Sequence, residues 1–174
     1  LAALSALATL YDDLEYLIKN KTITYSTEVV CFSTFLQERL AYFDALASSK
    51  EITLFSTIEP SLHVNINRIE LQRIVDNNIT NAIKYTFENE KIVVSLYKDE
   101  ESCRFTIASH SRKIQEPKKI FEEYYREEQS QDGFGLGLNL VKRLCKEENV
   151  KITLHSDENI TSFSYQFKVD NAWK

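Results

Sequence analysis

All three glycines of the 174-residue chain fall within five residues, at Gly133, Gly135 and Gly137. Glycine is the residue that best tolerates a positive φ and the close approach of a ligand to the backbone. The cluster leads into residues 138–143, Leu-Asn-Leu-Val-Lys-Arg, whose pattern predicts a helix. A loop that opens a helix presents unpaired N–H groups and the positive end of the helix dipole to a phosphate. The cluster therefore favours a nucleotide site, with a hinge or turn as the alternative.

Composition narrows the class of protein. Hydrophobic residues make up 43% and charged residues 27% of the chain, which is typical of a soluble globular domain. The net charge of −5 argues against nucleic acid as a partner. The cysteines are odd in number and form no CxxC, so we expect buried thiols in a reducing compartment: Cys31, Cys103 and Cys145. The histidines show no metal-ligand spacing: His63, His110 and His155.

No targeting or membrane segment is visible in the sequence. No apolar run approaches the roughly 18 residues that a membrane span needs, and no signal peptide is present. The chain begins at Leu1 and contains no Met, so we expect it to be part of a longer protein.

Residues 4–18 predict a helix with a narrow apolar seam. Its apolar residues recur at alternating spacings of three and four: Leu4, Leu7, Tyr11, Leu14 and Ile18. This spacing suits association with another helix, so we expect a dimerisation helix. A helix packed on its own domain is the alternative.

The rest of the chain predicts an α+β fold. Strands are expected at 27–32, 52–56, 63–66, 91–98, 102–109, 150–156 and 161–169, and helices at about 33–49, 67–86 and 136–148. Ser33 or Thr34 is expected to cap the first of these helices and Asn67 the second, since Thr34 and Asn67 each begin a capping-box pattern. Strands 91–98 and 102–109 read as a hairpin. Residues 110–135 have no clean period and are interpreted as a lid or binding loop. We expect several helices on one face of a mixed sheet.

The helix at 67–86 carries a polar cluster beside its core face. At 100° per residue the core face holds Leu71, Val75, Asn78, Ile79 and Ala82. Asn77, Asn81 and Lys84 fall within about 60° of one another beside that face, with Tyr85 at the border. Amide oxygens coordinate Mg²⁺ in company with phosphate oxygens, and Lys84 adds a cation. The alternative is an ordinary exposed polar face.

Three motifs together carry a family resemblance. Asn77-Asn-Ile-Thr-Asn81-Ala-Ile-Lys84-Tyr85-Thr86 resembles the N box of sensor histidine kinases. Residues 120–126, Ile-Phe-Glu-Glu-Tyr-Tyr-Arg, resemble their F box, and residues 133–138 resemble their second glycine box. The order and spacing also agree, as does Thr161-Ser-Phe163 near the end of the chain. The resemblance covers residues from about 28 to 169.

The resemblance implies an ATP-binding catalytic domain of the Bergerat type, a two-layer sandwich of a mixed sheet and about three helices. It implies ATP and Mg²⁺ as cofactors. Asn81 would be the Mg²⁺ ligand, and Asn77 would support metal, water or phosphate. Lys84 would reach phosphate, and Tyr85 would line the nucleotide.

The same resemblance implies roles for residues near the lid. The three glycines, with Leu136 and Leu138, would shape the end of the lid and present N–H groups to the phosphates. Phe121 would anchor the lid, and Arg126 would contact phosphate or the phosphoacceptor domain. Ile114 would line the nucleotide, and Thr161 would stand near the adenine end.

The first glycine box of the family, Asp-x-Gly-x-Gly, is altered here. The aligned residues are Ser109-His110-Ser111-Arg112-Lys113, followed by Ile114. The family's Asp accepts a hydrogen bond from the adenine amino group. A hydroxyl bond is about half as strong as one to a carboxylate, so Ser109 predicts ATP binding weakened about tenfold. Ser111 and Lys113 are expected to narrow the adenine pocket, and Lys113 alternatively contacts nucleotide or an acidic neighbour. Asn78 lies on the core face and is expected to need hydrogen-bond partners.

The family's phosphoacceptor His motif is absent from the chain. We therefore expect residues 1–25 to be the end of the dimerisation hairpin with a linker, and residues 26–174 to be the ATP-binding domain, with its lid at about 110–135. The resemblance implies a homodimer through the N-terminal helix, a response-regulator receiver domain as partner, and a cytoplasmic location in a parent protein of the bacterial inner membrane.

The sequence is compatible with three functions. The first is the catalytic part of a sensor histidine kinase. The second is a pseudokinase that keeps the fold as an interaction module, which Ser109 favours. The third is an ATP-hydrolysing relative such as gyrase or MutL. Those ATPases place a Glu general base where Asn77 stands, and an amide cannot take a proton from water.

Overall fold

The computed structural model describes residues 26–127 and 135–170. The helix expected at 4–18 and Gly133 lie outside these described residues. The elements are, in chain order, β1 (Glu28–Cys31), α2 (Phe32–Ser48), β2 (Thr53–Ile58), β3 (His63–Ile66), α3 (Arg68–Tyr85), β4 (Lys91–Asp99), β5 (Ser102–Ser109), the 3-10 helix η1 (Lys119–Phe121), α4 (Gly137–Glu147), β6 (Lys151–Ser156) and β7 (Thr161–Lys168).

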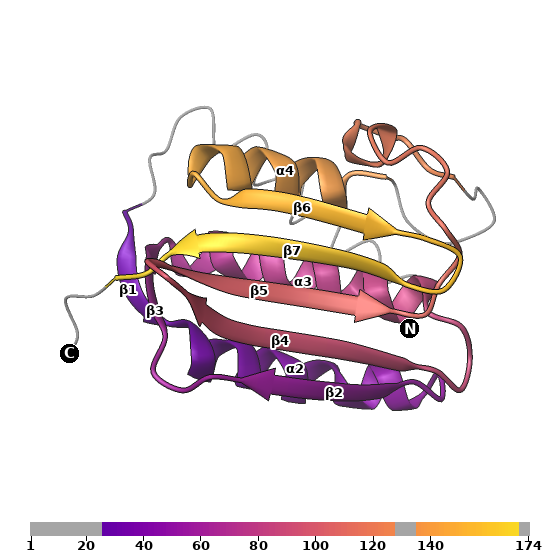
Figure 1. The fold of residues 1–174 in the computed structure, drawn as a ribbon, viewed down its shortest axis with the longest axis horizontal. Helices are drawn as coiled ribbons and strands as arrows, with labels where there is room; N and C mark the ends of the chain where they lie inside the picture. The colour runs from indigo at the N-terminus through magenta and orange to yellow at the C-terminus, as the bar shows by residue number, and fades with distance from the viewer. Residues whose placement is uncertain (1–25, 128–134, 171–174) are drawn as a thin grey trace.

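Five strands form a mixed sheet in the order β2-β4-β5-β7-β6. β2 runs parallel to β4, and the other neighbours are antiparallel. The expected hairpin of β4 and β5 is present, with Asp99 opposite Ser102 at its closed end. β1 and β3 form a separate antiparallel pair. Helices α2, α3 and α4 all lie behind the five-stranded sheet (Figure 1), so the α+β two-layer fold is confirmed.

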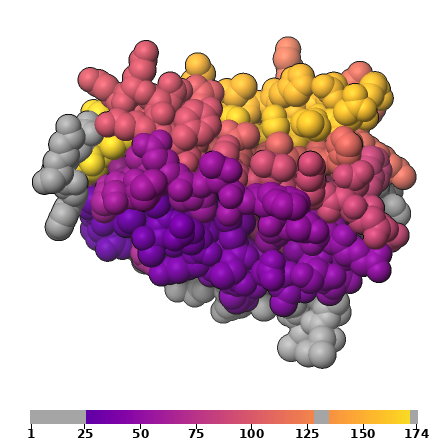
Figure 2. Space-filling view, turned by 60° about the horizontal axis from the view of Figure 1, so that its bottom comes forward, coloured from indigo at the N-terminus to yellow at the C-terminus, as the bar shows by residue number. Residues whose placement is uncertain are grey.

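Apolar buried side chains alternate with exposed ones along the strands, which explains why helices cover only one face of the sheet. In β4, Ile92, Val94 and Leu96 are fully buried, whereas Val93 and Tyr97 are 40% and 42% exposed. The buried face packs on the helices and the other face meets solvent, as expected for a largely antiparallel sheet. Figure 2 views the molecule from the side of α2 and β2, whose indigo and purple atoms cover the lower front of its surface.

Helix α3 is capped as the sequence predicts. Asn67 is its N-cap, and the Asn67 side-chain oxygen accepts hydrogen bonds from the backbone N–H groups of Ile69 (2.9 Å) and Glu70 (3.3 Å). This satisfies two of the donors that a helix start leaves open. The cap fixes where α3 begins, and therefore which of its residues face the sheet.

The expected cap of α2 was wrong. The helix begins at Phe32, ahead of both Ser33 and Thr34, and Cys31 at the N-cap makes no side-chain cap bond. Phe32 is fully buried and its N–H donates to the Leu62 carbonyl at 2.7 Å. The Ser33 hydroxyl donates to the Glu59 carbonyl (2.6 Å) and accepts from the Leu62 N–H (3.0 Å). Tertiary bonds to the loop before β3 thus set the helix start in place of the local capping pattern.

Two of the three thiols are buried, as expected. Cys103 and Cys145 lie in the core, and burial raises the pKa of each thiol to about 12. Cys31 is half-buried. Among the described residues, no helix is both long enough and apolar enough to cross a membrane.

Candidate nucleotide-binding site

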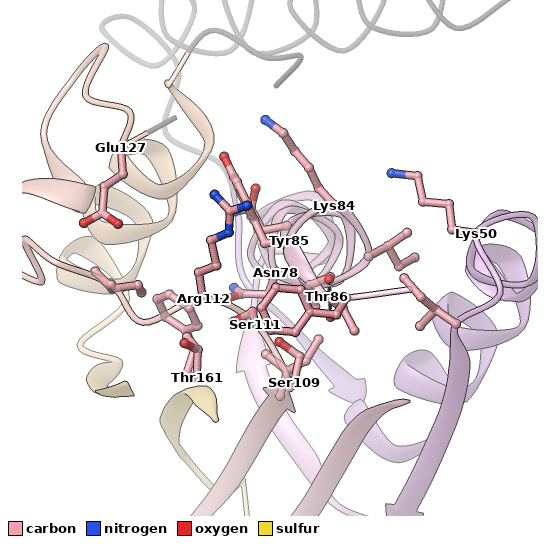
Figure 3. A pocket seen from close by; sticks show the side chains of 18 of the residues that line it. Lys50, Asn78, Lys84, Tyr85, Thr86, Ser109, Ser111, Arg112, Glu127 and Thr161 are labelled. Carbon is pink, nitrogen blue, oxygen red and sulfur yellow. Dashed lines mark hydrogen bonds between the residues drawn. The ribbon is translucent and has the colours of Figure 1, made fainter. Parts of the chain in front are cut away.

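A cavity of about 920 Å³ lies beside the C-terminal half of α3 (Figure 3). Its walls come from the last two turns of α3, the end of β5 with the segment after it, the start of β7, and the turn that follows α2. This volume is within the range of small-molecule sites.

Most of the predicted site residues line this one cavity: Asn81, Lys84, Tyr85, Ser109, Ile114, Arg126, Leu138 and Thr161. They come from α3, β5, the segment before residue 128, α4 and β7, so the fold gathers residues that are far apart in the sequence. The other predicted site residues in the described part of the chain do not form its lining: Asn77, Phe121, Gly135, Leu136 and Gly137.

The polar face of α3 supplies one wall. Asn81, Lys84 and Tyr85 all border the cavity, as the helical spacing predicts. The Lys84 ammonium lies 4.8 Å from the centre of the Tyr85 ring. In Figure 3 the Lys84 side chain extends away from the strands and from Ser109. This face therefore offers an amide, a cation and an aromatic ring to a ligand.

Asn77 lies against the start of α4. Its side-chain N–H donates to the Arg73 carbonyl at 2.9 Å. A Cβ placed on Gly137 would overlap the Asn77 side-chain oxygen. A larger residue at position 137 would therefore require the Asn77 side chain to shift. The first turn of α4 has no side-chain cap, so its N–H groups are not satisfied by a local side chain.

The backbone conformation and surroundings at position 135 require glycine. Its φ is +71°, and an added Cβ would lie 2.9 Å from the Tyr124 carbonyl carbon and the Tyr125 carbonyl oxygen. The Tyr124 N–H donates to the Gly135 carbonyl at 3.1 Å. The glycine therefore joins the segment after η1 to the approach to α4.

Phe121 packs on the sheet side of the site. Its ring meets the ring of Phe163 edge to face, with 6.3 Å between centres. The Asn139 side chain of α4 donates to the Phe121 carbonyl at 3.0 Å. These contacts hold η1 against β7 and α4. Leu136, the N-cap residue of α4, is buried, and Leu138 in the first turn of α4 lines the cavity.

The end of the cavity nearest the sheet is lined by buried hydroxyls. Ser109, Ser111, Thr86 and Thr161 are each 8% exposed or less. Ser109 and Thr161 face each other across the β5–β7 ladder. The Thr161 hydroxyl shares a 2.8 Å hydrogen bond with that of Ser156. Thr86 and Ser111 form a β-bridge that fastens the segment after β5 to the end of α3.

Asn78 has the partners that its burial requires. It is 2% exposed, its side-chain N–H donates to the Ile74 carbonyl at 2.7 Å, and its oxygen accepts from the Tyr165 hydroxyl at 2.7 Å. The expectation that Asn78 needs internal partners is confirmed. Burial raises the pKa of Tyr165, so this hydroxyl stays protonated and remains a donor.

Sequence reasoning missed several lining residues: Ser49, Lys50, Glu51, Glu88, Arg112 and Tyr125. Lys50 and Glu51 follow α2 and reach the site because α2 packs beside α3, which no local motif reports. Arg112 sits within the altered glycine box, so its position was a usable signal. Lys113 does not line the cavity and instead pairs with Glu158 at 3.0 Å, the acidic-neighbour alternative.

Metal binding here would depend on amide and phosphate oxygens. In residues 26–127 and 135–170, no group of three or more His, Cys, Asp or Glu side chains is placed to hold a metal ion. Asn81 lines the cavity and is the kind of ligand that Mg²⁺ takes together with phosphate oxygens and waters. The donor set fits a metal that arrives with a phosphorylated ligand.

Comparisons with known proteins show the family to which this chain belongs. Residues 66–171 match the family described as histidine kinase-, DNA gyrase B- and HSP90-like ATPases. The sensor histidine kinase HprS of Escherichia coli strain K12 is 32% identical over 142 residues, which are 80% of this chain and 29% of that protein. The chain belongs to this ATPase family, and within it to the ATP-binding catalytic domains of two-component sensor histidine kinases.

Solved structures agree on the fold. Full-length ShkA in complex with AMPPNP superposes with a TM-score of 0.81 at 20% identity, covering 95% of this chain and 36% of that one. The histidine kinase ThkA in complex with the response regulator protein TrrA gives a TM-score of 0.77 at 18% identity, with 98% and 50% covered. The chain spans less than a third of the length of HprS.

Proposed function

We propose that the chain binds Mg-ATP in the cavity beside α3 and, within a longer protein, donates the γ-phosphate to a histidine on a dimerisation helix, for relay to a response regulator. The observation that carries this proposal is the convergence of the Asn81–Lys84 face, the start of α4 and the buried hydroxyl end on one cavity. The cavity volume of about 920 Å³ accommodates a nucleotide.

Each residue of the cavity has a proposed role that follows from its position. Asn81 would hold Mg²⁺, which neutralises phosphate charge when bound. Lys84 and Arg126 add positive charge, and the uncapped N–H groups at the start of α4 favour anionic oxygens. The Asn77 side chain packs against Gly137 and so helps to hold α3 and α4 together. Phosphoryl transfer depends mainly on such positioning and charge stabilisation.

Transfer to a protein is favoured over hydrolysis. Position 77 carries an amide, which cannot act as a general base for water. The relatives named above are kinases, and ThkA is seen with a response regulator. We propose the same kind of partner here, a homodimeric parent protein, and a cytoplasmic position for this domain in a parent of the bacterial inner membrane.

Autophosphorylation of the full-length protein tests the proposal. With γ-labelled ATP and Mg²⁺, the wild type is expected to gain acid-labile label on histidine. Asn81→Ala is expected to lose most of it, whereas Asn65→Ala, an exposed Asn of β3, retains it. Equal labelling of the two variants would contradict the role given to Asn81. No label in the wild type would contradict the proposed activity.

A further inference from the structure

The end of the cavity nearest the sheet holds two buried hydroxyls without partners. Ser109 is 8% exposed and Ser111 is 4% exposed, and both line the cavity. Among the residues that the structure describes, neither hydroxyl makes a hydrogen bond to another protein group, and neither hydroxyl oxygen is fully buried. Both hydroxyls are therefore free to pair with water or with a ligand that enters the cavity.

The neighbouring hydroxyls are already engaged. Thr86 donates to the Ala82 carbonyl at 2.6 Å, which leaves its oxygen only as an acceptor. Thr161 shares its bond with Ser156, whose oxygen also accepts from the Ile114 N–H at 2.9 Å. Ser109 and Ser111 are therefore the groups of this end that remain able both to donate and to accept.

Among the described residues that line the cavity, no buried carboxylate lies at the end nearest the sheet. The acidic residues that line the cavity, Glu51, Glu88 and Glu127, are all exposed. Figure 3 shows Ser109, Ser111 and Thr161 together near the strands, with Glu127 well away from them. The groups that would meet a base are therefore neutral hydroxyls.

Neutral hydroxyls do not distinguish the two purines by hydrogen-bond pattern. Adenine presents an amino donor at the position where guanine presents a carbonyl acceptor. A carboxylate can only accept and so favours one pattern, whereas a hydroxyl rotates to serve either. Strong rejection of an analogue requires that it leave a buried group unpaired, and a hydroxyl that can either donate or accept pairs with the amino group of adenine or the carbonyl of guanine.

We propose that this site takes purine nucleoside triphosphates with little preference for adenine over guanine, because Ser109 and Ser111 adapt to both bases. This inference rests on the proposed nucleotide binding. It implies dissociation constants for Mg-ATP and Mg-GTP that agree within about tenfold.

The inference is tested by calorimetric titration of the 174-residue chain with Mg-ATP and with Mg-GTP. The wild type is measured first and the variants afterwards. A ratio of dissociation constants within about tenfold is expected. Ser109→Asp should widen the ratio in favour of ATP by about tenfold or more, since a carboxylate faces the guanine carbonyl unfavourably. Ser162→Asp adds the same charge on the neighbouring strand β7, outside the cavity lining, and should leave the ratio unchanged.

The outcomes separate the two proposals. Tight ATP binding with GTP weaker by more than about tenfold overturns the base inference and leaves the proposed function standing. An unchanged ratio in a folded Ser109→Asp variant also overturns it. If that variant does not fold, Ser109→Ala replaces it and should weaken both nucleotides alike; selective loss of one contradicts the inference. Binding of neither nucleotide to the wild type overturns both proposals.

Discussion

The Tyr165 hydroxyl donates a 2.7 Å hydrogen bond to the side-chain oxygen of Asn78, across 87 residues of sequence. Tyr165 on β7 is fully buried and Asn78 on α3 is 2% exposed, so neither group has water as a substitute partner. The bond joins the helix that carries Asn81 to the sheet. It therefore fixes the rotation of α3 and the direction of its polar face.

Removing one side of this bond should be costly. Tyr165→Phe leaves the Asn78 oxygen without its donor, and Asn78→Leu leaves the Tyr165 hydroxyl without its acceptor. Each is expected to lower the free energy of unfolding by about 1–3 kcal/mol. Urea unfolding followed by circular dichroism measures the change.

The double variant provides the sharper check. Asn78→Leu with Tyr165→Phe leaves neither group unpaired, so its loss should be clearly smaller than the sum of the two single losses. Tyr97→Phe is the matched control, because Tyr97 is 42% exposed on the open face of the sheet, and it should change stability little. Additive single losses would show that the two side chains are not coupled.

Gly137→Ala tests the contact between α3 and α4. The new methyl group would push the Asn77 side-chain amide aside and weaken its bond to the Arg73 carbonyl, so we expect a loss of about 1 kcal/mol in stability. Adding Asn77→Ala removes the obstructing amide and should restore most of that loss. Thermal unfolding of the two variants gives the comparison, and failure of Asn77→Ala to rescue Gly137→Ala would argue against this packing.

Glu148 predicts a pH dependence of stability. Burial, together with a hydrogen bond that the protonated Glu148 carboxyl donates to the carboxylate of Glu70, raises the pKa of Glu148 from 4.5 to about 7. The folded protein therefore keeps a proton that the unfolded chain releases near pH 4.5. This contribution to stability is fully present below that pH and is lost as the pH rises through about 7.

The measurement is the free energy of unfolding between pH 5 and pH 8, taken as the difference between wild type and Glu148→Gln. The wild type should lose stability relative to Glu148→Gln as the pH rises. Glu147→Gln, at the neighbouring exposed position, should follow the wild type. A pH-independent difference for Glu148→Gln would contradict the shared proton.

Much of the fold follows from local pattern, and the exceptions have tertiary causes. The apolar residues at every second position of β4 can be seen in the sequence, and so can the N-cap at Asn67. Both depend only on neighbours within a few residues. The cap at Thr34 failed because a buried Phe32 and its bond to the Leu62 carbonyl moved the helix start. Pattern alone cannot weigh a contact 30 residues away.

The site shows the same division. Helical spacing is enough to place Asn81, Lys84 and Tyr85 on one wall. Lys50 and Glu51 enter the cavity only through the packing of α2 beside α3, and the sequence offers no motif for them. The contact of Asn77 with Gly137 likewise depends on how α4 docks, which explains why spacing assigned Asn77 a ligand role but not a packing one.

The central claim is that the cavity beside α3 binds Mg-ATP, and calorimetric titration of the 174-residue chain with ATP in the presence and absence of Mg²⁺ tests it most directly. We predict saturable binding that strengthens with Mg²⁺ and is lost in Asn81→Ala but kept in Asn65→Ala. An absence of saturable binding at millimolar ATP, in a chain shown to be folded, would contradict the claim.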